Sequence, residues 1–229
     1  MTLENGAFQR IAPYALFMAF VGLEQLLGFW AANGGDPGLK SAAMYLYPIK
    51  ALTVGLLLVT LRSGYTEIRL RDLLKFNQSL AGIVLGIAVF ILWINMDWYY
   101  TTHSQQGFNP EILQDYRMRT AMTIVRMSGA VIVVPVMEEL FWRSFLIRYI
   151  INPTYSQIPI GRFSWSSFLI TTVLFGFEHH LLLAGIMAGA AYNLLLYCTR
   201  SIAQCILAHA VTNLALGIYV LCTGQWRFW

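Results

Sequence analysis

The sequence predicts an all-α, polytopic membrane protein, a single bundle of about seven to eight transmembrane helices. Of its 229 residues, 58% are hydrophobic and only 11% are charged, whereas soluble domains carry about 25% charged residues. The apolar residues are gathered in long runs separated by short polar segments. The length suits one domain, so we expect residues 1–229 to form a single integral membrane domain.

The first predicted helix covers Ile11–Ala31, about twenty residues, which is enough to cross a bilayer. It contains Glu24 and Gln25, which a secretory signal does not usually carry, so we expect it to be retained in the mature protein. A turn over residues 33–38 separates it from a second helix over Ser41–Leu61.

Two opposite charges lie inside these first two helices. Glu24 and Lys50 fall at a similar depth, roughly 17–20 Å from the inner ends of their helices at 1.5 Å per residue. Intramembrane charges usually pair, so we expect an ion pair that neutralises both. The alternative is that they belong to a substrate or proton pathway.

The third predicted helix covers Leu80–Met96, and the fourth runs from Arg119 to Tyr149, long enough to tilt or to protrude. Between them, residues 97–118 form the longest polar connection, which leaves room for an extra interfacial or re-entrant helix. Asp97 and Arg126 lie near the outer ends of these helices. We therefore expect interfacial contacts for both.

The last three predicted helices cover Trp165–His179, Leu181–Cys198 and Ile202–Cys222. The middle one contains Gly185-x-x-x-Gly189, a spacing of small residues that lets neighbouring helices approach closely. The three cysteines lie in or beside apolar segments and form no CxxC pattern. They are typical of small buried hydrophobic residues, not of a disulfide framework or a zinc–thiolate site.

The basic residues predict the orientation in the membrane. With the N-terminus in the cytoplasm, the loops after the second, fourth and sixth helices are cytoplasmic, and they carry most of the positive charge: Arg62, Arg69, Arg71, Lys75, Arg148, Arg162 and Arg200. This distribution follows the positive-inside rule. Because the basic residues form no patch interleaved with aromatic residues, we expect membrane lipid and no nucleic acid as a partner. The sequence gives no oligomeric state.

An acidic pair stands out within the apolar run 130–145. Glu139 and Arg143 are four positions apart, so they share a helix face and can pair. Glu138 points about 100° away and is left free to act as a base. Pro135 removes one helical hydrogen bond, which could bend the helix and admit water. Charged groups inside a bilayer normally face a polar interior, where they have a function.

Further polar residues follow on two later helices. His179 lies four positions after Phe175, and Asn213 lies four positions after His209. From the inner helix ends, Glu138 and His209 lie about 14–16 Å deep and His179 about 20 Å deep. We expect them to converge if the helix of His179 begins below the membrane surface or is tilted.

A carboxylate, two imidazoles and a carboxamide at one depth are suited to hydrolysis. An apolar setting makes a glutamate a stronger base towards water. A histidine and an asparagine can donate to the oxyanion that forms on a peptide carbonyl, worth roughly 3–4 kcal/mol per donor. One alternative is that each histidine only hydrogen-bonds between helices. Another is a hydrolytic zinc ion held by Glu138, His179 and His209, although the sequence has no HExxH.

The three motifs, Glu138-Glu139-x-x-x-Arg143, Phe175-x-x-x-His179 and His209-x-x-x-Asn213, occur in this order on apolar helices. In order and context they resemble the type II CAAX prenyl endopeptidases and bacteriocin-processing intramembrane proteases, the CPBP or Abi family. The resemblance covers about residues 119–215, the expected catalytic core. The Val-Pro-Val-Met segment before Glu138 is similar to bacterial members associated with exosortase protein-sorting systems.

The resemblance implies a glutamate-dependent intramembrane endopeptidase that needs no organic cofactor. Glu138 would activate water with His179, and His209 with Asn213 would stabilise the oxyanion. The supporting residues would be Glu139, Arg143 and Phe175. The implied substrate is a membrane-associated protein or peptide, lipidated or carrying a sorting signal, and the implied location is a bacterial plasma membrane.

Two other classes of function stay open at this stage. A transporter or channel could relay protons or ions through Glu138, His179 and His209, but it predicts a symmetry between the two halves that the sequence does not display. A catalytically silent scaffold or immunity protein of the same fold is the second alternative. The intact motif residues argue against such a loss of activity.

Overall fold

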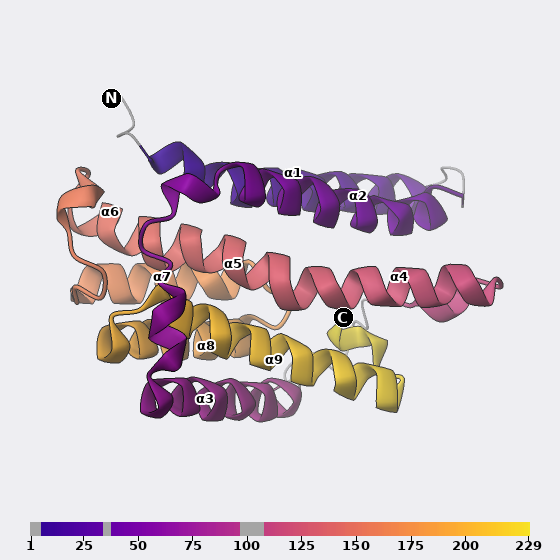
Figure 1. The fold of residues 1–229 in the computed structure, drawn as a ribbon. Helices are drawn as coiled ribbons and strands as arrows, with labels where there is room; N and C mark the ends of the chain where they lie inside the picture. Colours follow the sequence, from indigo (N-terminus) through magenta and orange to yellow (C-terminus); the bar gives the residue numbers. More distant parts are fainter. Residues whose placement is uncertain (1–5, 34–37, 97–107) are drawn as a thin grey trace.

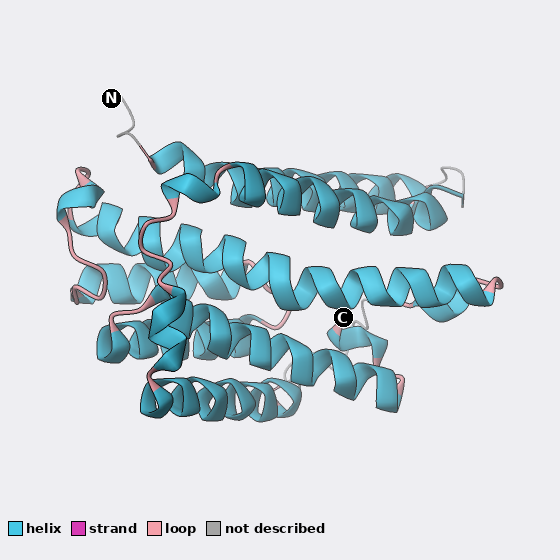
Figure 2. Cartoon of the chain, in the orientation of Figure 1, coloured by secondary structure: helices cyan, strands magenta, loops and turns pink. Residues whose placement is uncertain are grey.

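The computed structural model describes residues 6–33, 38–96 and 108–229, with the backbone only for residues 38–43. Within these ranges all regular structure is helical, as Figure 2 shows, and the predicted all-α fold is confirmed. Each helix expected from the sequence is present, with bounds that differ by a few residues. Asp97 and most of the expected interfacial helix over 97–118 lie outside the described residues.

One long helical run forms the middle of the bundle (Figure 1). It consists of α4 (Tyr116–Ser128), a π-helical turn η5 (Gly129–Val133), α5 (Val134–Glu139), a second π-helical segment η6 (Leu140–Leu146) and α6 (Ile147–Ile151). Asp115 caps its start by accepting a hydrogen bond from the Met118 amide at 2.7 Å. The run covers 36 residues. It is therefore about 54 Å long at 1.5 Å per residue, more than a bilayer core requires.

A helix pair covers one side of this run. α1 (Ala7–Ala32) and α2 (Gly38–Thr60) lie side by side, and Figure 1 shows them as a separate layer above the long run. α1 packs against α5 and η6, whereas α2 packs against α4 and η5. The pair therefore lies over the stretch that holds the acidic pair.

Four helices cover the other side: α3 (Phe76–Asn95), α7 (Trp165–Phe177), α8 (Leu182–Thr199) and α9 (Ile202–Thr223). α3 packs on α8 and α9, and α7 packs on α8. Small residues permit these contacts. A Cβ at Gly86 of α3 would lie 2.5 Å from the Ala208 carbonyl oxygen, and one at Gly185 of α8 would lie 2.9 Å from the Gly176 Cα. The Gly185-x-x-x-Gly189 stripe thus brings α8 close to α7.

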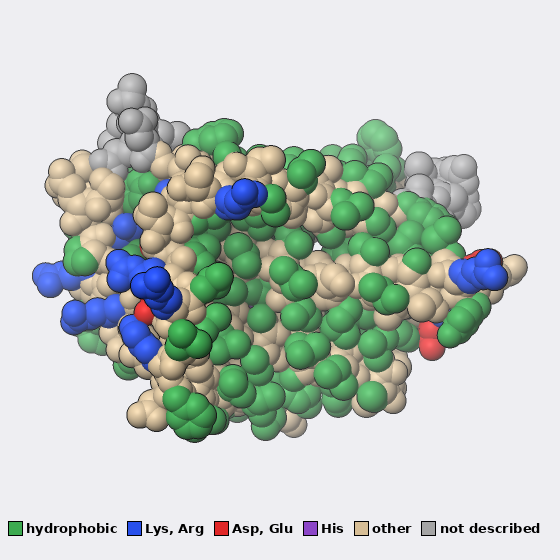
Figure 3. All heavy atoms as spheres, viewed as in Figure 1, with side chains coloured by type: hydrophobic (Ala, Val, Ile, Leu, Met, Phe, Trp, Pro, Cys, Tyr) green, Lys and Arg blue, Asp and Glu red, His purple; other side chains and the backbone are tan. Residues whose placement is uncertain are grey.

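The outside of the bundle is apolar. Figure 3 shows hydrophobic side chains over most of the visible face, and Leu52, Leu56 and Val84 are each more than half exposed. In the described residues, five helices are long and apolar enough to cross a membrane: α1, α3, the run Tyr116–Ile151, α8 and α9. Met44–Thr60 and Trp165–Phe177 are shorter apolar helices. The protein is therefore an integral membrane protein, and its total number of spans stays a prediction.

A polar network closes the end of the bundle at which α6 lies, where Figure 3 shows Lys and Arg side chains gathered. Arg10 of α1 binds Glu67 through Nη2 at 2.6 Å and Nε at 2.7 Å. Ser144 of η6 donates to the same carboxylate and also receives a hydrogen bond from Arg148 at 2.9 Å. Burial would raise the pKa of Glu67, but the hydrogen bonds from Arg10 and Ser144 outweigh it and hold this pKa below its usual value. The network joins α1, the segment 61–75 and the long run.

Candidate active site

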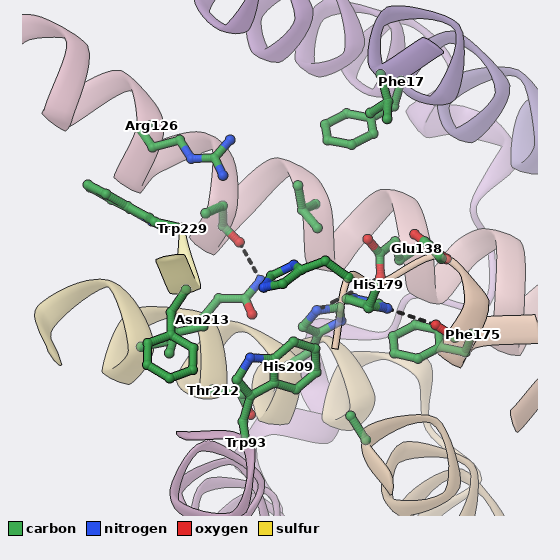
Figure 4. Close-up of a pocket in the computed structure, with 18 of the residues that line it drawn as sticks. Phe17, Trp93, Arg126, Glu138, Phe175, His179, His209, Thr212, Asn213 and Trp229 are labelled. Carbon is green, nitrogen blue, oxygen red and sulfur yellow. Dashed lines mark hydrogen bonds and ion pairs between the residues drawn. The ribbon is translucent and has the colours of Figure 1, made fainter. Parts of the chain in front are cut away.

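A cavity of about 360 Å³ lies inside the bundle, between α1 and α2 on one side and α9 on the other. Glu138, His179, His209 and Asn213 all line it, and Figure 4 shows their side chains around the same space. The four residues that the sequence predicted to act together therefore come together, from α5, from the turn after α7, and from α9.

The two acidic neighbours have different surroundings. Glu138 faces the cavity, and its Oε2 lies 3.9 Å from the His209 Nε2. Glu139 is fully buried, and its Oε1 accepts a hydrogen bond from Arg143 Nη1 at 3.2 Å. The geometry expected from the spacing of four residues is present. Glu138 is the carboxylate that points into the cavity.

Arg143 connects the acidic pair to α8. Its Nε donates to Asn193 Oδ1 at 3.1 Å, and its Nη2 donates to the Gly189 carbonyl at 3.4 Å. The guanidinium carbon lies 4.4 Å from the ring centroid of Phe175. A buried charge needs such satisfied contacts, because leaving it unpaired is costly. Arg143 therefore holds Glu139 in one position within the bundle.

His179 lies in the turn that follows α7. Its Nδ1 is 2.7 Å from the Phe175 carbonyl oxygen. Because a carbonyl only accepts, Nδ1 must carry the proton, and Nε2 is left with its lone pair. The ring packs edge-on against Trp93, with the two centroids 5.2 Å apart. The spacing of four residues between Phe175 and His179 thus orients the imidazole.

His209 is oriented by a carboxylate instead. Its Nδ1 lies 3.0 Å from Glu139 Oε1, the same oxygen that accepts from Arg143. Its ring stacks on Tyr192, with the centroids 5.0 Å apart and an angle of 22° between the planes. These contacts leave the Nε2 edge facing Glu138 and the cavity.

Asn213 lies one turn after His209 and donates through Nδ2 to the Ala130 carbonyl at 2.8 Å. Ala130 belongs to the π-helical turn and lies five positions before Pro135, the spacing of a π-helical hydrogen bond. Proline has no amide hydrogen, so this carbonyl lacks that helical donor. Pro135 therefore opens the helix at the point where Asn213 binds it.

The alternative of a zinc ion held by Glu138, His179 and His209 stays a prediction. Across residues 6–33, 38–96 and 108–229, no group of three or more His, Cys, Asp or Glu side chains could hold a metal ion. In His179 and in His209 the Nδ1 atom is bound to an acceptor of the protein, which leaves the Nε2 atom of each ring for water, substrate or an ion.

A family model connects this geometry to known proteins. The model described as Rce1-like, type II CAAX prenyl endopeptidase, matches residues 120–215. That segment contains all seven predicted site residues.

Residues 120–215 belong to the Rce1-like family.

This match supports a CAAX-type intramembrane endopeptidase, a hydrolase, and it does not favour the transporter or the silent scaffold. The expected exosortase-associated subgroup stays a prediction. No curated protein and no solved structure matches the chain.

The Rce1-like segment also contains a carboxylate that the sequence analysis missed. Glu178 Oε2 accepts hydrogen bonds from Tyr14 Oη at 3.1 Å and from Trp142 Nε1 at 2.9 Å. Glu178 lines the same cavity as Glu138. The sequence could have indicated Glu178, because this carboxylate lies directly before His179 at the end of an apolar run.

Residues outside the Rce1-like segment complete the other end of the cavity. Lys50 Nζ lies 2.8 Å from Glu24 Oε2, so the expected ion pair is present, and both residues also line the cavity. Arg126, for which the sequence predicts an interfacial contact, lines the same cavity, and its depth in the membrane stays a prediction. The long helix begins ten residues before Arg126, about 15 Å further out, and this places Arg126 inside the bundle.

Proposed function

We propose that this Rce1-like protein hydrolyses a peptide bond in a membrane-associated protein with a water molecule activated by Glu138, and that it needs neither a metal ion nor an organic cofactor. The observation that carries the proposal is the position of Glu138. It is a carboxylate only 3% exposed, in a cavity that His179, His209 and Asn213 also line. A cavity of about 360 Å³ with several polar side chains has the room and the hydrogen-bonding groups that a water molecule needs.

Glu138 and His179 would prepare the water together. A carboxylate removed from bulk solvent is a stronger base than one in water, and it can take a proton from the attacking water. His179 carries its proton on Nδ1, so its Nε2 can accept a hydrogen bond from the same water. The water is then held by two acceptors, with a lone pair left to attack the carbonyl carbon.

His209 and Asn213 would stabilise the tetrahedral intermediate. Asn213 uses one amide hydrogen on Ala130 and has a second for the oxyanion. His209 donates from Nε2 when its ring is doubly protonated, with Glu139 as the counter-ion at Nδ1. Each such donor is worth roughly 3–4 kcal/mol of barrier. The bond between the carbonyl carbon and nitrogen then breaks, and Glu138 returns its proton to the leaving amine.

The test is cleavage of membrane-tethered peptides by the purified protein in liposomes. Glu138→Gln and Glu138→Ala should lose turnover by about 10²-fold or more, because a positioned base contributes about that factor. Glu111→Gln is the matched control, since Glu111 is exposed outside the bundle core, and it should cleave at the wild-type rate. Turnover by Glu138→Ala at the wild-type rate would contradict the role of Glu138 as the base. Loss of turnover on treatment with a chelator would replace it with the zinc alternative.

The proposal also places the protein in a bacterial plasma membrane with its N-terminus in the cytoplasm. The gathering of Lys and Arg side chains at one end of the bundle supports this orientation (Figure 3). Single cysteines can test it in a background without Cys198 and Cys222, which are exposed. Ser63→Cys at the α6 end should react with an impermeant thiol reagent only after the cells are opened. Gln114→Cys at the other end should react in intact cells, and the reverse pattern would invert the orientation.

A further inference from the structure

The cavity has two chemically different ends. Glu138 and the histidines form one end, which is where the proposed hydrolysis takes place. Arg126, Lys50 and Glu24 form the other end, and Figure 4 shows Arg126 on the long helix, well separated from Glu138. The proposed reaction uses none of these three residues.

Arg126 is held at its charged group, yet it pairs with no carboxylate among the described residues. Its guanidinium carbon lies 4.3 Å from the ring centroid of Tyr47 and 5.4 Å from that of Phe108. Its Nε is buried and has no hydrogen-bond partner in the described parts of the chain. The aromatic rings fix the guanidinium while leaving a donor unused.

Among the described side chains at this end of the cavity, the charges of Arg126, Lys50 and Glu24 sum to one positive charge. Lys50 is neutralised by Glu24 at 2.8 Å, so Arg126 supplies the remainder. A cation inside a membrane protein is costly without a partner. A guanidinium offers a planar fork of donors that matches a carboxylate in size and shape. A single carboxylate would therefore satisfy both the charge and the unused donor.

The position of Arg126 suits a group carried by the peptide that is being cut. Arg126 is one helical turn, about 6 Å, from Ala130, which holds Asn213. It is twelve positions, about 18 Å, from Glu138 on the same helical run. An extended peptide covers about 3.3–3.6 Å per residue. A carboxylate about two to five residues from the scissile carbonyl would therefore reach Arg126.

We propose that Arg126 forms an anion subsite that binds a carboxylate of the peptide substrate and so sets which bond is presented to Glu138. This inference rests on the proposed function, whose cavity it shares. A lipid phosphate offers the same charge, but Arg126 lies ten residues inside the start of α4, and its partner Tyr47 lies nine residues inside the start of α2. The subsite is therefore some 13–15 Å from the ends of both helices, within the cavity that also holds Glu138.

The experiment measures binding without turnover, in the full-length Glu138→Gln protein in nanodiscs of zwitterionic lipid. One fluorescent apolar peptide is prepared in three forms: with a free terminal carboxylate, with an amidated terminus, and with an amidated terminus plus a glutamate three residues from the centre. Fluorescence anisotropy gives the dissociation constant of each. At least one carboxylate form should bind about tenfold more tightly than the plain amide, as expected for a charge-assisted pair. The form that does so identifies a terminal or a side-chain carboxylate as the ligand.

Variants of Arg126 are compared in the same background. Arg126→Gln should remove the difference between carboxylate and amide while leaving the amide peptide unchanged, and Arg126→Lys should keep part of it. Arg117→Gln is the matched control, because Arg117 is exposed on the same helix. It should keep the full difference.

Equal affinity for all three peptides, or an equal loss for carboxylate and amide in Arg126→Gln, would overturn the subsite. Competition by anionic lipid that depends on Arg126 would assign the site to a phosphate and also overturn it. The readout is separate from catalysis. If the wild type cleaves no peptide but the carboxylate preference persists and depends on Arg126, the subsite stands and the hydrolysis proposal fails.

Discussion

Glu139 Oε1 lies 3.0 Å from His209 Nδ1, and the same oxygen accepts a hydrogen bond from Arg143. One buried carboxylate thereby orients an imidazole and satisfies a guanidinium. Arg143 in turn reaches α8 through Asn193 and Gly189. The orientation of His209 on α9 is thus set by contacts that join three separate parts of the bundle.

The first prediction concerns Glu139→Gln. The amide keeps the size of the side chain but removes the negative charge that His209 and Arg143 both face. We expect kcat to fall by about 10²-fold, with a smaller change in KM, because the group affected acts on the oxyanion. The melting temperature should also fall, since Arg143 is left as a buried charge without its counter-ion. Peptide cleavage and thermal unfolding in detergent check the two effects.

The second prediction concerns His179→Gln. The change removes the imidazole Nε2 that faces the cavity, so kcat should fall by about 10²-fold or more. The matched control is His180→Gln at the next position. His180 also borders the cavity, but its side chain is exposed and it is not the histidine bound to the Phe175 carbonyl, so this variant should cleave at close to the wild-type rate. Equal losses in the two variants would contradict the role given to His179.

The third prediction concerns Asn213→Asp. The aspartate is nearly the same size but its ionised side chain cannot donate, so both the bond to the Ala130 carbonyl and the oxyanion donor are lost. We expect kcat to fall by about 10²–10³-fold. Cleavage assays at a saturating concentration of peptide would measure kcat for the variant and the wild type. A variant that changes only KM would show that Asn213 binds substrate and does not stabilise the transition state.

The helices could be predicted from the sequence because hydrophobic runs are local. The third predicted helix, Leu80–Met96, corresponds to α3 over Phe76–Asn95, and the last, Ile202–Cys222, to α9 over Ile202–Thr223. The contact between Glu139 and Arg143 followed from helical spacing alone, since both residues lie on one run.

Depth within the bundle could not be predicted in the same way. The predicted depths of His179 and Glu138 differed by about 5 Å at 1.5 Å per residue. The structure brings both to one cavity because α7 ends at Phe177 and His179 lies in the turn beyond it. The sequence also did not predict that Arg126 lines this cavity, because the packing of the long helix cannot be derived from its composition.

Contacts between segments far apart in the chain could not be predicted from the sequence either. Glu178 is joined to Tyr14, 164 positions away, and Ser144 is joined to Arg10, 134 positions away. Nothing in local spacing links such pairs. They become visible only when α1 is seen to pack on α5 and η6.

The last prediction concerns Glu67→Gln and the network at the α6 end. Glu67 is nearly buried, and its carboxylate binds Arg10 and Ser144, so its pKa is lowered on folding. A lowered pKa stabilises the folded state above the unfolded pKa, about 4.3 for glutamate, and this contribution is lost as the pH falls through the folded pKa. We expect Glu67→Gln to lower the free energy of unfolding by about 1.5–3 kcal/mol at pH 7, because hydrogen bonds to a charged group contribute about this much. Below about pH 4 the difference from wild type should shrink. Denaturant titrations in micelles at several pH values measure it, with Glu111→Gln as the exposed control. A difference that is constant from pH 7 to pH 3 would show that the charge of Glu67 does not stabilise the fold.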